Sequence, residues 1–195
     1  MRKMLVSSFL LVFLFFAPRE LFPQSKSLDW QLQFLKEKTN ESMPINKIIG
    51  MKTGDGFNLV IKADDDCYCY VFIYDSEQNI YVWYNQAVEK GSETPLDTLD
   101  LAEPSGTETI YVIVSSSRQA ELEKLITQFN NSSSSQNTSN LYREIMRLQD
   151  TASGRGEPGA TVIPSGGTTK GLDDGGFATK FTGKELYVRA IGIRH

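Results

Sequence analysis

The segment Ala63-Asp-Asp-Asp-Cys-Tyr-Cys-Tyr-Val-Phe-Ile-Tyr74 joins three aspartates to an unbroken apolar and aromatic run. Successive side chains of a β-strand point to opposite faces, so the four aromatic residues share one face and the cysteines, valine and isoleucine share the other. Because neither face is polar, the pattern predicts a central strand covered on both sides. The aspartates mark where the chain enters that core from solvent.

The segments around this strand predict further strands. Residues 57–63 alternate with period two, and the polar residues 75–79 separate the central strand from a hairpin partner at Ile80–Tyr84. Apolar runs at Glu108–Val114 and Leu186–Ile193 predict two more strands. We therefore expect a mainly β protein, an antiparallel β-sandwich (Ig-like) with one to three peripheral α-helices.

Helical spacing appears in three places. Leu28, Leu32 and Leu35 suggest a short amphipathic helix, and the apolar stripes of 118–129 and 141–148 suggest two more. The Ser/Asn tract 130–139 between the last two is expected to be a flexible linker, and the Gly- and Pro-rich residues 150–176 a surface loop or a disordered segment.

The N-terminus has the pattern of a secretory signal peptide. Arg2 and Lys3 precede an apolar run from Met4 to Ala17, and Pro18 stops that run short of the roughly 20 residues that a spanning helix needs. We expect a signal peptide at 1–24, an N-terminal helix and first strand at 25–52, and a single β-sandwich domain at 53–195. The protein would then be periplasmic or secreted, with no transmembrane span after cleavage; an uncleaved membrane anchor is the alternative.

The charge of the chain and its cysteine content limit the ligands and the kinds of site that we expect. The chain has 20 basic and 24 acidic residues and a net charge of −4, which argues against nucleic acid as a ligand because such binding depends on clustered Lys and Arg. Cys67 and Cys69 are the only cysteines. We expect both to be small core residues rather than a strained disulfide or half of a metal site, since two residues along one strand separate Cα atoms by about 6.6 Å.

Candidate site residues fall into two groups. Aromatic side chains suit a recognition surface, with core packing as the other interpretation; they are Tyr68, Tyr70, Tyr74, Tyr81, Trp83 and Tyr84. Acidic oxygens suit Ca²⁺, although solvated loop ends explain them as well; the weak candidates are Asp64, Asp66, Asp173 and Asp174. We predict no cofactor.

Catalytic residues are harder to find. The only histidine, His195, is expected to be a solvated strand end, so a triad built on an imidazole base has little to work with. We predict no enzyme activity; the alternative is a hydrolase that cleaves glycans with paired carboxylates.

Two blocks of sequence carry a family resemblance. One is Gly56-Phe-x-Leu-x-Ile-x-Ala-Asp-x-Asp-Cys-Tyr-x-Tyr-Val-Phe72, and the other is Glu103-Pro-x-Gly-Thr-Glu-Thr-Ile-Tyr-Val112, which a Ser-rich turn and a helix follow. Together they resemble the bacterial family called domain of unknown function 4384, over the middle third of the chain. Members of that family are often attached to caspase-like or kinase domains, so the resemblance implies an accessory or ligand-sensing module.

We therefore expect a non-catalytic exported binding or accessory module that recognises a protein or a cell-envelope component. A calcium-stabilised structural protein is a further alternative, which the aspartates would support.

Overall fold

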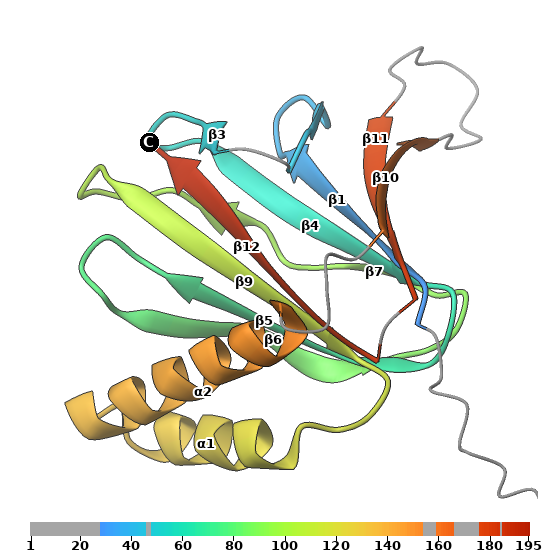
Figure 1. The fold of residues 1–195 in the computed structure, drawn as a ribbon. Helices are drawn as coiled ribbons and strands as arrows, with labels where there is room; N and C mark the ends of the chain where they lie inside the picture. Colours follow the sequence, from blue (N-terminus) through green and yellow to red (C-terminus); the bar gives the residue numbers. More distant parts are fainter. Residues whose placement is uncertain (1–27, 46–47, 154–158, 166–175, 184) are drawn as a thin grey trace, which may run out of the picture.

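The computed structural model describes residues 28–45, 48–153, 159–165, 176–183 and 185–195. The expected signal peptide, Asp173 and Asp174 lie outside the described residues. Two sheets of mainly antiparallel strands pack face to face, and two helices cover the outer side of one sheet (Figure 1). The predicted mainly β sandwich with one to three peripheral helices is confirmed.

The first sheet contains seven strands. Its main order is β10-β11-β1-β4-β7, with β2 beside β1 and β8 beside β4. The bounds of these strands are β1 Trp30–Lys36, β2 Ser42–Met43, β4 Gly56–Ala63, β7 Glu93–Pro95, β8 Leu99–Asp100, β10 Gly159–Ser165 and β11 Gly176–Thr182.

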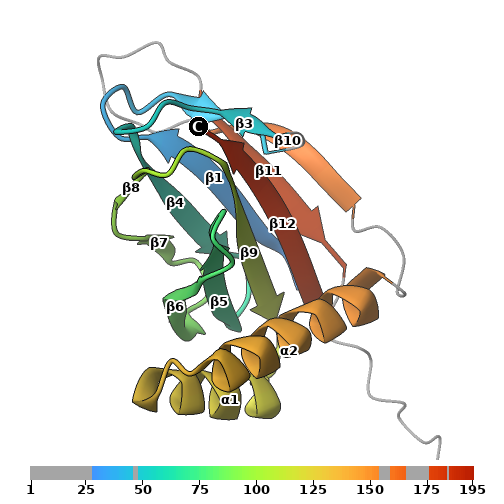
Figure 2. The ribbon, with the colours of Figure 1, turned by 90° about the vertical axis from the view of Figure 1, so that its left-hand side faces the viewer.

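The second sheet has the order β3-β12-β9-β5-β6. Its strands are β3 Ile49–Gly50, β5 Cys67–Tyr74, β6 Ile80–Val88, β9 Thr107–Ser115 and β12 Leu186–Arg194. Among the described strand pairs, β3 and β12 alone are parallel. The helices α1 Ala120–Asn131 and α2 Ser135–Ser153 lie side by side against this second sheet, on the side away from the first (Figures 1 and 2).

The central strand β5 is covered on both sides, as its sequence predicts. Its neighbours are β6 and β9. Cys67, Cys69, Val71 and Ile73 belong to the core between the sheets, whereas Tyr70 and Phe72 belong to the core beneath the helices. Both cysteines are buried and free of a disulfide, as expected of small core residues.

The helix predicted at the start of the chain is wrong. Residues 30–36 form β1, which pairs with β4 along its whole length. Trp30, Leu32 and Phe34 are at most 1% exposed, and polar residues alternate with them. The period-two alternation therefore decides this segment, and the helical spacing of Leu28, Leu32 and Leu35 is incidental. Of the strand expected after this helix within residues 25–52, the described residues include the short strand β3, Ile49–Gly50.

The flexible linker predicted at 130–139 is also wrong. Only residues 132–134 separate the two helices. Ser134 accepts the N–H of Asn137 through its hydroxyl oxygen at the start of α2, and the amide of Asn137 donates to the carbonyl of Gln128 near the end of α1. The Ser/Asn composition thus supplies helix caps.

The surface loop or disordered segment expected at 150–176 is wrong for the part of this range that the structure describes. α2 extends to Ser153, and residues 159–165 form β10, which pairs antiparallel with β11. The intervening residues 154–158 and 166–175 lie outside the described part of the chain. Among the described residues, no helix has the length and apolarity needed to cross a bilayer.

Candidate functional site

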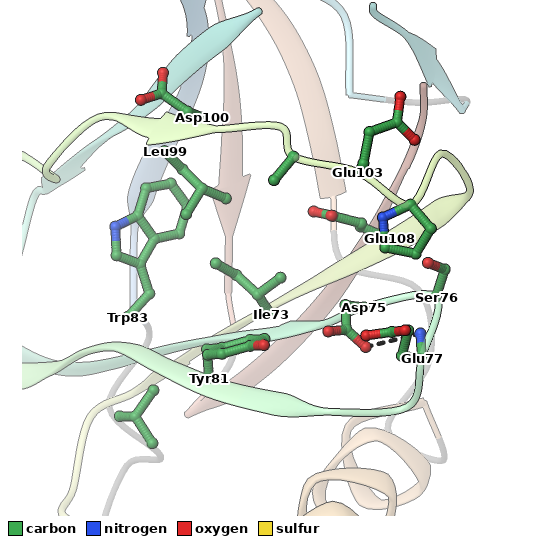
Figure 3. Close-up of a pocket in the computed structure, with 13 residues that line it drawn as sticks. Ile73, Asp75, Ser76, Glu77, Tyr81, Trp83, Leu99, Asp100, Glu103 and Glu108 are labelled. Atoms are coloured by element: carbon green, nitrogen blue, oxygen red, sulfur yellow. Dashed lines mark hydrogen bonds between the residues drawn. The ribbon is translucent and has the colours of Figure 1, made fainter. Parts of the chain in front are cut away.

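A cavity of about 350 Å³ lies between the edges of the two sheets, bordered by β5 and β6 of one and β8 of the other (Figure 3). Its size falls in the range of small-ligand or side-chain pockets. The turn between β5 and β6 and the segment between β8 and β9 border its end.

One wall of this pocket is apolar and aromatic. Ile73, Tyr81, Trp83 and Leu99 contribute to it, from three different strands (Figure 3). Trp83 is held by an edge-to-face contact with Phe57 of β4, with ring centroids 5.7 Å apart. Tyr81 is 52% exposed, so the wall is accessible from solvent.

A β-bulge in β6 places these aromatic rings. Val71 pairs with Tyr84, whereas Phe72 pairs with Val82, so Trp83 is the extra residue. Without that extra residue Trp83 and Tyr84 would point to opposite faces, as neighbours on a regular strand do. With it, both rings pack against the core between the sheets.

The other side of the pocket carries carboxylates. Glu108 lies two residues before the buried Ile110 on β9, so its side chain also points into the space between the sheets, and Figure 3 shows it directed toward the pocket. Asp75 and Glu77 of the β5–β6 turn line the same pocket, below Glu108 in Figure 3. Asp100 and Glu103 are at the rim, with their carboxylates pointing away from the other labelled side chains (Figure 3).

These carboxylates differ in their partners. Asp75 Oδ1 accepts the backbone N–H groups of Glu77 and Asn79, at 2.9 and 2.8 Å, and Oδ2 accepts the side-chain amide of Asn79 at 3.0 Å. Asp75 therefore holds the turn together. Glu103 accepts the N–H of Ser105 at 2.8 Å. No residue that lines the described pocket is a lysine or an arginine.

Burial raises the pKa of Glu108 above its ordinary value, and the negative charge of Asp75 adds to this, while His195 acts in the opposite direction. The pKa of Tyr81 is also raised, by burial first and then by the carboxylates of Asp75, Glu77 and Glu108. Both shifts have the direction expected of a site with negative potential.

His195 is not a solvated strand end, so that expectation is wrong. Its side chain is 0% exposed, with Nδ1 3.2 Å from the hydroxyl of Thr53 and Nε2 3.4 Å from Oε1 of Glu108. The backbones of His195 and Gly106 exchange two hydrogen bonds, which bring the end of β12 beside the turn before β9.

The aromatic candidates are divided between the two faces of the second sheet. Tyr68, Tyr70 and Tyr74 pack beneath the helices, where the hydroxyl of Tyr70 donates to Glu123 and the ring of Tyr74 stacks on Tyr142. Tyr81 and Trp83 line the pocket. Tyr84 faces the same core as Trp83 but lies outside the pocket lining.

The aspartate candidates at the start of β5 have partners within the protein. Asp64 forms an ion pair of 3.0 Å with Lys180, and Asp66 accepts the backbone N–H of Lys90 at 2.8 Å. No group of three or more metal-ligating side chains occurs in the described ranges.

Sequence reasoning missed Glu108, Asp75, Glu77, Ile73 and Leu99. The sequence did carry one signal: Glu108 lies in the alternating pattern of β9, on the same face as the buried residues that follow it. A carboxylate at such a position must lie at the end of the core. No local sequence pattern indicates that Glu108 lies in the same pocket as Asp75 and Glu77, which are more than thirty residues earlier in the chain.

No family model matches the chain, and searches of the curated proteins and of the solved structures find no match. The resemblance to domain of unknown function 4384 therefore stays a prediction.

Proposed function

We propose that this protein is an exported, non-catalytic binding module, and that the pocket between the sheet edges is where it recognises a protein or envelope component. The N-terminal signal pattern supports export, and the resemblance to domain of unknown function 4384 supports an accessory or ligand-sensing role. Neither feature bears on where the ligand binds, so the pocket carries that part of the proposal.

The observation that carries the proposal is the pairing of an apolar, aromatic wall with carboxylates in one cavity. Tyr81 and Trp83 offer ring faces, and Glu108 and Glu77 offer negative charge, with no basic residue in the lining. A lysine or arginine side chain matches both features, because its apolar stem packs on rings while its charged end seeks carboxylates. The pocket is thus suited to an anchoring side chain of a protein partner.

One observation favours a carboxylate-dependent hydrolase of glycans as the second candidate. Glu108 has a raised pKa and lies near Asp75, which resembles the acid and base pair of glycoside hydrolysis. However, three hydrogen bonds from the turn occupy Asp75, so it is poorly placed to act as nucleophile or base. Binding without catalysis fits these contacts better.

The test is photo-crosslinking in intact cells. A photoreactive phenylalanine at Tyr81 would lie on the pocket wall, and the same residue at Lys124, an exposed position on α1, is the matched control. We expect one dominant protein adduct from position 81 and none of that adduct from position 124. The absence of an adduct at position 81, or equal capture at both positions, would reject the pocket as the recognition site.

A further inference from the structure

The strand that borders the pocket, β6, is the least protected edge of the sandwich. Exposed edges are normally kept from pairing by short length, proline or charged side chains. β3 has two residues, β7 has three and ends in Pro95, and β10 includes Pro164. β6 has nine residues, Ile-Tyr-Val-Trp-Tyr-Asn-Gln-Ala-Val, with neither a charge nor a proline.

The outer edge of β6 is also open. Its only strand neighbour is β5 in the described sheets. Asn85, Gln86 and Ala87 are exposed one after another, so side chains on both faces of the strand are accessible here. The register with β5 is regular from Tyr84 to Val88, and none of the described turn and loop backbone hydrogen bonds involves β6. Backbone groups of β6 that point away from β5 therefore have no strand partner among the residues that the structure describes.

The negative charge near this edge indicates what kind of segment could pair with β6. The bulge at Trp83 joins the open stretch of β6 to the pocket, and the turn before β6 carries Asp75 and Glu77. An added strand would place alternate side chains on the pocket side, next to these carboxylates. A second copy of this chain fits less well, because its β6 has no basic residue to offer and the chain has a net charge of −4.

We propose that the partner presents an extended segment rich in lysine or arginine, which pairs with β6 as an additional strand and inserts one basic side chain into the pocket. Main-chain hydrogen bonds to the β6 edge supply affinity, and the carboxylates beside Tyr81 supply the preference for basic side chains. This inference rests on the proposed function, of which it specifies the ligand.

The experiment is an NMR titration of the protein with two capped peptides. One alternates lysine with valine and threonine, and the other has glutamate in place of lysine. We expect the lysine peptide to shift the backbone amides of residues 80–88 and to slow their hydrogen exchange, and we expect the glutamate peptide to bind at least about tenfold more weakly.

Three variants make this test specific. Ala87→Lys places a charge on the open edge and should weaken the binding of the lysine peptide by about tenfold or more. Glu77→Gln removes an exposed pocket carboxylate and should weaken it about two- to fivefold, as expected for an exposed ion pair. Glu121→Gln makes the same change on the exposed side of α1, outside the pocket lining, and should leave the dissociation constant unchanged.

Other outcomes overturn the inference. Equal binding of the two peptides, no binding, or shifts confined to another strand would reject the basic β6 ligand. Protection of the β6 amides without peptide, together with a concentration-dependent dimer in sedimentation, would make a second copy the occupant. If position 81 captures a partner whose complex leaves the β6 amides unprotected, the proposed function stands and this inference alone fails.

Discussion

At the scale of single residues, Tyr70 shows how an aromatic side chain that suggests binding can serve the fold. Its hydroxyl accepts the backbone N–H of Gln119 at 3.1 Å and donates to Glu123 at 2.8 Å. Gln119 caps α1 but makes no capping hydrogen bond with its own side chain. A tyrosine on the sheet thus accepts the N–H of the N-cap residue, which a glutamate or glutamine at the third helical position accepts in a capping box.

Tyr70→Phe should therefore lower the free energy of unfolding by about 1–3 kcal/mol, because it leaves a partly buried N–H without its acceptor. Urea denaturation measures this loss. The matched control is Tyr68→Phe, since Tyr68 contacts Arg118 through its ring face rather than its hydroxyl among the described interactions. Equal effects of the two substitutions would contradict the capping role.

Glu108 makes a prediction about pH. Its pKa is raised in the folded protein, mainly by burial, so the stability that its protonated form contributes is present below the ordinary value of 4.5 and is lost as pH rises through the raised folded value. Glu108→Gln mimics the protonated form. It should raise Tm at about pH 7, and the gain should vanish near about pH 4, where the native side chain is protonated as well.

Thermal unfolding of both proteins across this pH range provides the measurement. The matched control is Glu121→Gln, which makes the same change at an exposed glutamate paired with Lys124. A lower Tm of Glu108→Gln at neutral pH would mean that the His195 contact outweighs burial.

At the scale of elements, the prediction from sequence succeeds where one period is unambiguous. β4, β5, β9 and β12 were all expected within about one residue of their bounds, since their alternation or continuous apolarity admits no helical interpretation. The prediction for the residues of β1 was wrong because leucines at helical spacing coincide with a period-two pattern there. The prediction of a flexible linker for the Ser/Asn tract was wrong because helix caps and linkers are rich in the same residues.

The last strand makes a prediction at this scale. β12 lies between β3 and β9 and contributes Tyr187, Ile191 and Ile193 to the core between the sheets. Truncation after Gly183 would remove these side chains and leave the long edge of β9 unpaired. We expect insoluble protein, checked by the soluble fraction after expression beside the full chain. A soluble, cooperatively folding truncated protein would show that β12 is dispensable.

At the scale of the whole molecule, the candidate site escaped sequence reasoning because it belongs to no single segment. The pocket needs the β5–β6 turn, the bulge at Trp83, the start of β9 and the short strand β8. Their association depends on how two sheets align, which local patterns do not encode. The aromatic residues were recognisable as candidates, whereas their division between two faces follows from the bulge and from the helices.

The second sheet links the two cores. Strands β5 and β9 give alternate side chains to the core between the sheets and to the core beneath the helices. Neither core can therefore lose its packing without disturbing strands that the other core needs. We expect the described sandwich and its helices to unfold in one cooperative transition.

This cooperativity can be tested with one substitution in each core. Ile61 of β4 and Ile145 of α2 are both 0% exposed, and replacing either with alanine should lower the free energy of unfolding by about 2–5 kcal/mol.

The chain has two tryptophans, and both Trp30 and Trp83 pack in the core between the sheets. Their fluorescence therefore reports on the sheets, while far-UV circular dichroism near the helical minimum reports on α1 and α2. For both variants the two signals should shift to the same lower midpoint. If Ile145→Ala lowers only the helical midpoint and leaves tryptophan fluorescence as in the native protein, the helices form a separate layer that folds on an independent sandwich.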